Sequence, residues 1–252
     1  PQDPAERSRT ATVIGTGVGG FPAITDAVNL VRERGPRRLS PFVVPSFLPN
    51  LATGQVSIRY GFSGPSGAPT TACAASVQAI GDGMRLILTG EADVAVCGGT
   101  DACVGGFAAA RALSTGFNAT PTRASRPFDK GHDGFVLSEG AATIVIERLS
   151  HARARGATPL AILAGYGTTS DAYHVTAGCP DGAGAQASMQ LALRMAEAHP
   201  DEVDYVNAHS TSTPVGDAAE IAALRSVFRG RGKDLAVTST KSSTGHLLGA
   251  AG

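Results

Sequence analysis

One cysteine and two histidines stand in settings where side chains carry out chemistry. Cys73 lies between alanines in APTTACAAS (residues 68–76), after a strand-like segment and before a predicted helix. The backbone amides at a helix N-terminus lower a thiol pKa from about 8.5 to roughly 3.5–7.5, so Cys73 is a candidate nucleophile. The small neighbours leave room for a substrate. The other cysteines are better interpreted as small buried residues: Cys97, Cys103 and Cys179.

The two histidines each follow a predicted strand. His209 opens the polar loop HSTSTPVGD, and His246 lies in TKSSTGHLLGAAG (240–252). The ends of separate strands can converge on one site in an open α/β fold. The remaining histidines are interpreted as surface or loop residues: His132, His151, His174 and His199.

These residues are also compatible with two other kinds of site, a zinc site and the active site of a hydrolase. A zinc site would use Cys73, His209 and His246 as ligands, but their spacings match no structural zinc pattern. A Cys–His–Asn hydrolase would add Asn207, but it leaves His246 and Lys241 without a role. Both alternatives stay open on the residues alone.

Strand-like and helix-like segments alternate along the chain, which indicates an α/β protein with largely buried sheets. Strands are predicted at ATVIG (11–15), DVAVCGG (93–99), TIVIERL (143–149), VDYVNAHS (203–210) and LAVTSTKS (235–242). Helices are predicted at 23–35, 51–61, 76–90, 185–198 and 218–228, and a further apolar segment is LAILAGYG (160–167). Asn50 is predicted to cap a helix, and Gly35 and Gly90 to end helices. The basic stretch HARARGA (151–157) is the predicted boundary between two lobes.

The composition excludes several classes of function. Lys+Arg and Asp+Glu both number 21, which argues against bulk attraction to nucleic acid or to an anionic membrane. The apolar runs are short and interrupted by glycine, so we expect no membrane span. The first residues lack the apolar core of a signal peptide, and the cysteines have no CxxC spacing. We therefore predict a cytoplasmic protein.

A glycine-rich stretch, GTGVGG (15–20), follows the first predicted strand. A dinucleotide site would need a second strand that ends in an acidic residue. The next segment, RRLSPFVVPSFLPN (37–50), holds three prolines and no acid. We therefore interpret GTGVGG as a tight turn with close backbone contacts. The motifs of P-loop proteins and of serine hydrolases do not occur in the sequence.

Three motifs in order closely resemble the active-site motifs of the β-ketoacyl-acyl-carrier-protein synthases, in particular the type II elongating enzymes. They are TACAAS (71–76), NAHSTSTPVGDAAE (207–220) and TKSSTGHLLGAAG (240–252). RPFDKGHDGFVLSEGA (126–141) and GYGTTSDAYH (165–174) resemble other stretches of the family. The resemblance implies a thiolase-like layered α-β-α-β-α sandwich, partial here because both termini are missing. Its halves would be residues 1–155 and 156–252, in a homodimer.

The resemblance also implies roles for the reactive residues. Cys73 would accept an acyl chain from a carrier-protein thioester. His209 and His246 would stabilise the enolate formed when malonyl-carrier protein loses carbon dioxide, and the enolate would attack the acyl-cysteine. Lys241 matches the lysine that supports the histidines, and Glu220 matches a nearby acidic partner.

Further residues match positions that bind substrate or partner. Thr211 and Thr213 match hydroxyls that bind the pantetheine arm, and Val18 matches the end of the acyl pocket. Arg37 and Arg38 match a basic site for acyl-carrier protein. The resemblance implies no cofactor and no metal, since the substrates arrive on the phosphopantetheine arm of that partner. It implies neither a nucleic-acid partner nor a membrane partner.

The sequence departs from the family pattern at several points. Ser210 replaces a usual glycine, His132 replaces a usual arginine, and the segment between Gly99 and Gly106 is shorter than expected. The family begins before Pro1 and continues past Gly252 into a glycine-rich loop with a gating phenylalanine. We therefore expect the 252-residue chain on its own to be poorly soluble or inactive.

Two alternatives remain within the same fold. A ketosynthase of a polyketide pathway would share the chemistry but act on other acyl chains. A non-catalytic chain-length partner subunit commonly lacks the nucleophile, whereas Cys73 is present here. Selective alkylation of Cys73 by iodoacetamide would separate a catalytic subunit from such a partner.

Overall fold

The computed structural model describes residues 1, 3–101, 112–174 and 177–252. The chain divides into two compact units. Unit 1 comprises Pro1–Val104, Ser138–Leu160 and Leu247–Gly252, and unit 2 comprises Gly105–Leu137 and Ala161–His246. Cys103 lies outside the described residues, as does most of the segment from Gly99 to Gly106 that we expected to be short. The predicted division into residues 1–155 and 156–252 stays a prediction.

Unit 1 is built on a four-stranded sheet in the order β2-β1-β3-β4. The strands are β1 (Thr10–Gly15), β2 (Ser66–Gly67), β3 (Val94–Asp101) and β4 (Gly140–Glu147). β1 pairs in parallel with β2 and β3, and β4 pairs antiparallel with β3. All six residues of β1 are buried. Covering on both faces explains why this strand consists of small and apolar residues and two threonines, with no charged side chain.

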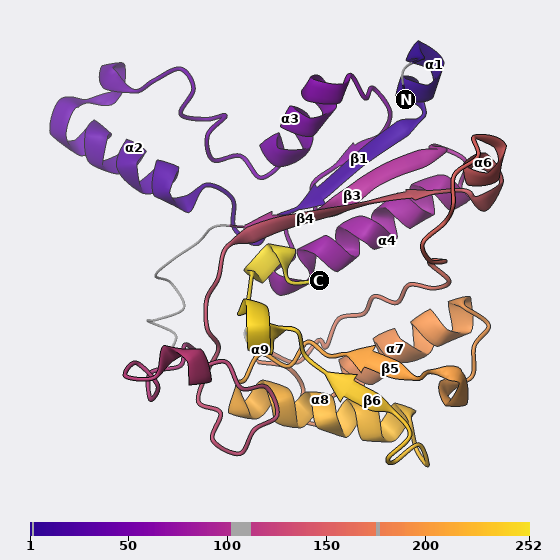
Figure 1. The fold of residues 1–252 in the computed structure, drawn as a ribbon. Coiled ribbons are helices and arrows are strands. Elements are labelled where there is room, and N and C mark those ends of the chain that lie inside the picture. Colours follow the sequence, from indigo (N-terminus) through magenta and orange to yellow (C-terminus); the bar gives the residue numbers. More distant parts are fainter. Residues whose placement is uncertain (2, 102–111, 175–176) are drawn as a thin grey trace. The chain divides into compact units, whose positions relative to one another are not determined.

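Helices cover the sheet of unit 1 on both faces (Figure 1). α4 (Ala75–Leu88) packs through Ala79 and Ile87 on the apolar residues of β1 and β3. On the other face α3 (Leu51–Tyr60) places the buried Thr53 hydroxyl where it donates to the Gly67 carbonyl at 2.8 Å. The remaining helices and 3₁₀ turns of this unit are α1 (Pro4–Ser8), α2 (Phe21–Arg34), η1 (Pro36–Arg38), η2 (Ala72–Ala74), α6 (Leu149–Ala154) and η5 (Leu248–Ala250).

The local signals at helix ends were confirmed in two cases and wrong in one. Gly35 and Gly90 follow α2 and α4 with φ of +78° each, a conformation that glycine adopts without a steric penalty. Asn50 occupies the position before α3, but its backbone is already helical and its side chain makes no capping hydrogen bond. The cap prediction is therefore wrong, because an effective N-cap residue has extended backbone angles.

The glycine-rich stretch 15–20 joins β1 to α2 as a close-packed turn, which confirms its interpretation. Gly19 has φ of +81°, and a Cβ atom there would lie 2.7 Å from the carbonyl oxygen of Phe47. Such a contact excludes a side chain, so the backbone of this turn requires glycine.

Unit 2 contains two short parallel strands, β5 (Tyr205–Asn207) and β6 (Ala236–Thr238). α7 (Ala183–Met195) and α8 (Pro214–Val227) pack together with these strands around Leu224, Val227 and Phe228. Segment 160–167 pairs with no strand among the described residues, although it is apolar. The shorter elements are η3 (Pro121–Arg123), η4 (Pro200–Glu202) and α9 (Lys241–Thr244).

The predicted alternation of strands and helices is confirmed in both units. In the part of the chain that the structure describes, every helix is too short or too polar to cross a lipid bilayer.

Candidate active site

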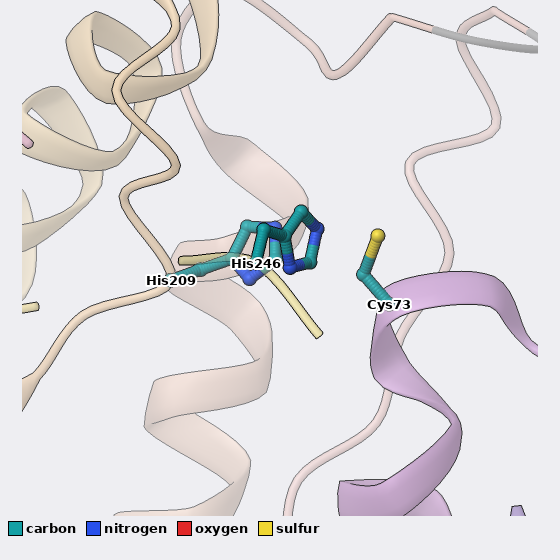
Figure 2. A group of neighbouring side chains, drawn as sticks. All are labelled: Cys73, His209 and His246. Atoms are coloured by element: carbon teal, nitrogen blue, oxygen red, sulfur yellow. The ribbon is translucent and has the colours of Figure 1, made fainter. Parts of the chain in front are cut away.

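Cys73 of unit 1 stands at the start of α4 (Figure 2). Ala72 takes a left-handed conformation with φ of +49°, which costs a non-glycine residue of the order of 1 kcal/mol. This sharp turn leads from the loop after β2 into η2 and then α4, and it leaves the Cys73 side chain half-buried. No side chain caps the start of α4. The first-turn amides and the helix dipole therefore favour a negative charge at this end of the helix.

The other described cysteines lie in settings that disfavour a thiolate. Cys97 is fully buried in β3, and burial together with the charge of Asp82 raises the pKa of its thiol to about 12. A hydrogen bond to Asp181 raises the pKa of Cys179. Both residues fit the interpretation of unreactive thiols.

His209 and His246 form a pair of rings within unit 2. Their ring centroids lie 5.4 Å apart and their planes meet at 83°, an edge-to-face arrangement visible in Figure 2. His209 follows β5, whereas His246 follows α9 and its backbone N–H donates to the carbonyl of Val136 at 2.7 Å. The buried ring of Phe135 contacts His246 edge to face with centroids 5.2 Å apart. Packing and backbone pairing together fix the orientation of the His246 ring.

The surroundings keep both imidazoles uncharged. Burial, the neighbouring His209 and the charge of Lys241 lower the pKa of His246 to about 3. Protein atoms crowded around the His209 ring, together with Lys241, lower its pKa to about 4, although Asp217 acts in the opposite direction. Solvent still reaches part of His209, whereas His246 is 2% exposed. At neutral pH each ring therefore carries one N–H donor and one acceptor nitrogen.

Glu220, on α8, holds the loop that carries His209. Its two carboxylate oxygens accept hydrogen bonds from the backbone N–H groups of His209 at 2.7 Å and of Ser210 at 2.6 Å. Burial raises the pKa of Glu220, and these hydrogen bonds and the charge of Lys241 oppose that shift. Ser210, which replaces the usual glycine, is buried, and its carbonyl accepts from the hydroxyl of Ser239 at 2.9 Å.

Lys241 and Asp217 place one positive and one negative group in the interior of unit 2. Lys241 begins α9 and is 5% exposed. Asp217 is 1% exposed, and its carboxylate accepts from the backbone N–H of Phe128 at 2.8 Å. Reasoning from the sequence missed Asp217, although it lies one helical turn before Glu220 and so shares its face of α8. It also missed Phe135, for which the sequence holds no comparable signal.

Asn207 is engaged in joining the ends of β5 and β6. Its side-chain oxygen accepts from the backbone N–H of Thr240 at 3.2 Å, and its amide donates to the Thr240 hydroxyl at 3.5 Å. These contacts favour a structural role and weaken the hypothesis of a Cys–His–Asn hydrolase.

The other predicted residues lie on loops and turns. The half-buried Thr211 and Thr213 follow His209, and their hydroxyl oxygens are 3.1 Å apart. Val18 is 40% exposed in the turn between β1 and α2. Arg37 and Arg38 are exposed in η1. The proposed binding roles of these residues stay predictions.

Comparison with known proteins gives consistent matches over the whole chain. The family profile "Beta-ketoacyl synthase, N-terminal domain" matches residues 1–152, and "Beta-ketoacyl synthase, C-terminal domain" matches residues 160–252. The mitochondrial 3-oxoacyl-[acyl-carrier-protein] synthase of Arabidopsis thaliana is 49% identical over 100% of this chain and 56% of its own length. The 3-oxoacyl-[acyl-carrier-protein] synthase 2 of Staphylococcus aureus is also 49% identical, over 97% of this chain and 61% of its own length. The chain thus spans about three fifths of these curated relatives.

Solved structures agree with these matches. The ketosynthase of a type II polyketide synthase, solved in complex with its acyl-carrier protein and bound to a hexaketide, superposes with a TM-score of 0.92. It is 32% identical to this chain, and the match covers 98% of this chain and 63% of that ketosynthase. A beta-ketoacyl synthase from Burkholderia phymatum STM815 gives a TM-score of 0.89 at 34% identity, over 60% of its length and 98% of this chain. The predicted thiolase-like α/β fold is thereby confirmed.

The lowered histidine pKa values predict acid sensitivity. An unfolded histidine titrates near pH 6.5, so between that pH and the folded-state values of about 4 and 3 the unfolded chain binds more protons. The free energy of unfolding should therefore fall as pH falls through this window. His246→Asn should flatten the dependence in urea unfolding of the full-length protein, whereas His199→Asn, at a side chain 71% exposed, should not. Equal slopes for the wild type and His246→Asn would contradict the buried, neutral imidazole.

Proposed function

The chain belongs to the β-ketoacyl synthase family, and we propose on this basis that the full-length protein catalyses a decarboxylative Claisen condensation. Malonyl-acyl-carrier protein would react with an acyl chain bound to Cys73 and give β-ketoacyl-acyl-carrier protein in fatty-acid elongation. The observation that carries this proposal is the pair of neutral imidazoles in unit 2. We also propose that Cys73 acts together with this pair of histidines in one active site.

The first step is the transfer of the acyl chain to Cys73. The thiolate attacks the thioester carbonyl of the acyl-carrier protein, a new thioester bond forms, and the carrier thiolate leaves and takes up a proton. The start of α4 supplies the positive end of a helix dipole, which stabilises the attacking thiolate.

The second step uses the histidines. Malonyl-carrier protein loses carbon dioxide when its C–C bond breaks, and the electron pair becomes an enolate with negative charge on the thioester oxygen. Two imidazole N–H donors aimed at that oxygen stabilise the charge. The enolate carbon then attacks the acyl thioester, and Cys73 leaves as the thiolate, ready for another cycle. Neutral rings suit this role because they donate a hydrogen bond without protonating the enolate as an imidazolium ion would.

Lys241 and Glu220 support this arrangement in different ways. The charge of Lys241 lowers the pKa of both histidines and so keeps them neutral. Glu220 fixes the backbone at His209 and Ser210 through two hydrogen bonds. Both residues therefore act through the histidines rather than on the substrate.

The substrates imply the partner. Acyl and malonyl groups would arrive on the phosphopantetheine arm of an acyl-carrier protein, with Thr211 and Thr213 binding the arm and Val18 lining the acyl pocket. The exposed Arg37 and Arg38 suit the acidic surface or phosphate of such a carrier. The proposed reaction requires neither a metal nor a redox cofactor, because thiolate attack and enolate stabilisation account for each bond that changes. We further propose a cytoplasmic location.

The two alternatives within the family are less well supported. The relatives named 3-oxoacyl-[acyl-carrier-protein] synthase are 49% identical, whereas the ketosynthase of the type II polyketide synthase is 32% identical. This difference favours fatty-acid elongation over a polyketide pathway. A non-catalytic chain-length partner would not need the helix-start cysteine, which is present at Cys73.

A homodimer is supported by the surface of α2 in unit 1. No residue of this helix is buried, and Phe21, Ile24, Val28 and Val31 are between 36% and 47% exposed at helical spacing. An apolar stripe of this length on a soluble protein is typical of an interface.

Replacement of Cys73 by alanine should separate the two steps. In the full-length protein Cys73→Ala should form no acyl-enzyme by mass spectrometry, because the acceptor sulfur is gone. The variant should still release carbon dioxide from malonyl-carrier protein, because the histidines remain. Condensation at the wild-type rate would show that Cys73 is not the acyl acceptor.

Replacement of either histidine should show the opposite separation. In His209→Ala and His246→Ala, carbon dioxide release should fall by roughly 10²–10³-fold, the usual effect of removing one oxyanion donor. Acylation of Cys73 should change less, since the helix start stabilises the thiolate. If both variants lost acylation and retained decarboxylation, the histidines would instead serve as bases for the thiol.

A charge in the apolar stripe should disrupt the proposed dimer. The wild-type full-length protein should sediment as a dimer at micromolar concentration, and Val28→Asp should shift it to monomer because a buried unpaired carboxylate is costly. Asn29→Asp is the matched control, an exposed polar position on the same helix, and should remain dimeric. A monomeric wild type would refute the homodimer, and a dimeric Val28→Asp would place its interface elsewhere.

A further inference from the structure

Asp101 joins two distant backbone segments within unit 1. This aspartate ends β3 and is 6% exposed. One of its oxygens, Oδ2, accepts hydrogen bonds from the backbone N–H of Gly17 at 2.9 Å and of Gly249 at 3.0 Å. The first amide belongs to the turn after β1, and the second belongs to the segment 247–252. The two segments are 232 residues apart in the chain and share one acceptor atom.

The two amides reach Asp101 because both residues are glycines. A Cβ atom at Gly17 would lie 2.3 Å from Asp101 Oδ2, and one at Gly249 would lie 2.3 Å from the backbone nitrogen of Gly17. A Cβ atom fits at neither position, so the two backbone segments and the Asp101 carboxylate pack together only with glycine at 17 and 249. The arrangement therefore depends on the residue types at all three positions.

The segment 247–252 is fixed to the start of α4 as well. The backbone N–H of Gly252 donates to the hydroxyl of Ser76 at 2.9 Å. Ser76 is buried in the first turn of α4, three residues after Cys73. The residue that precedes this segment in the chain is His246. Within unit 1, segment 247–252 is therefore bonded to the helix start that carries Cys73.

We propose that Asp101 is a positioning residue, which anchors segment 247–252 and the glycine-rich turn. This anchoring keeps His246 in the orientation that it needs for decarboxylation. The inference rests on the proposed function, because it assigns His246 a part in decarboxylation. In this scheme Asp101 touches no reacting atom and acts through the backbone amides of Gly17 and Gly249. The carboxylate suits the task because a charged acceptor makes stronger hydrogen bonds to backbone amides than a neutral one.

The test compares two half-reactions in the full-length protein. Asp101→Ala should reduce carbon dioxide release from malonyl-carrier protein by about 10²-fold, since small misplacements of a catalytic group have effects of this size. Acylation of Cys73 should fall by less than about threefold, because the sulfur and the helix start are unchanged. Asp101→Asn keeps an acceptor oxygen in the same place and should retain most of the decarboxylation.

A matched control separates positioning from general loss of stability. Asp93, also in unit 1, binds Arg9 and Arg148 at the surface, so Asp93→Ala removes a different anchored carboxylate. A purely structural role of Asp101 would lower both half-reactions by the same factor, as expected for Asp93→Ala. Equal losses in Asp101→Ala, or a normal decarboxylation rate, would overturn the proposal. If Asp101→Ala does not fold, the two half-reactions are compared in Asp101→Asn instead. Its amide oxygen is a weaker acceptor, so its small loss of decarboxylation should still exceed its loss of acylation.

A second readout does not depend on catalysis. Titration of ¹³C-labelled histidine by NMR should give a pKa of about 3 for His246 in the wild type, where burial, His209 and Lys241 lower it. In Asp101→Ala this value should rise toward 6.5 as the segment loosens, while His209 should keep its own value. An unchanged His246 would overturn the proposal even if the full-length protein proved to catalyse another reaction. A shifted His246 without condensation activity would support the anchor and refute only the proposed function.

Discussion

Two imidazole rings with centroids 5.4 Å apart, one of them buried, must both stay uncharged, and the charged groups around them in unit 2 follow from that constraint. Two adjacent imidazolium ions would repel each other, and each would lose its hydration on burial. Lys241 adds a third positive group that opposes protonation of either ring. The carboxylates of Asp217 and Glu220 balance that charge, and both are hydrogen-bonded to backbone amides.

The cysteine requires the opposite environment. A thiolate needs stabilisation of negative charge, and unit 1 provides it through the start of α4. The left-handed Ala72 places Cys73 at that point. The two kinds of group therefore depend on different elements: a helix terminus for the anion, and a crowded interior for the neutral donors. In the proposed function, this separation assigns acylation and decarboxylation to different residues.

Strands and helices with a regular residue pattern were predicted well from the sequence. Interactions between residues of different elements were predicted poorly. Buried strands such as 93–99 and the helix ends at Gly35 and Gly90 were predictable, because they depend on nearest neighbours. Asn50 was wrong because a cap depends on backbone angles that residue type alone does not fix. Glu220 was identified only through the resemblance to a family, since the fold alone shows that it meets the amides at 209 and 210.

Residues that act at long range carried little signal in the sequence. Phe135 contacts His246 across 111 positions of the chain, and Asp101 meets Gly249 across 148. Cys73, His209 and His246 were found from their places at the ends of predicted elements and from motifs that resemble those of a family, whereas the neighbours that set their chemistry emerged only from the fold. The proposed function depends above all on Cys73 as the residue that carries the acyl chain during turnover.

Peptide mapping by mass spectrometry tests that claim most directly. The wild-type full-length protein would be mixed with acyl-carrier protein bearing an isotope-labelled acyl group, digested, and then compared with a sample chased with malonyl-carrier protein. We expect the label on the peptide with Cys73 and on no other cysteine, and we expect the chase to transfer it to a β-ketoacyl product. A label on Cys97, Cys103 or Cys179, or a label on Cys73 that the chase leaves in place, would contradict it.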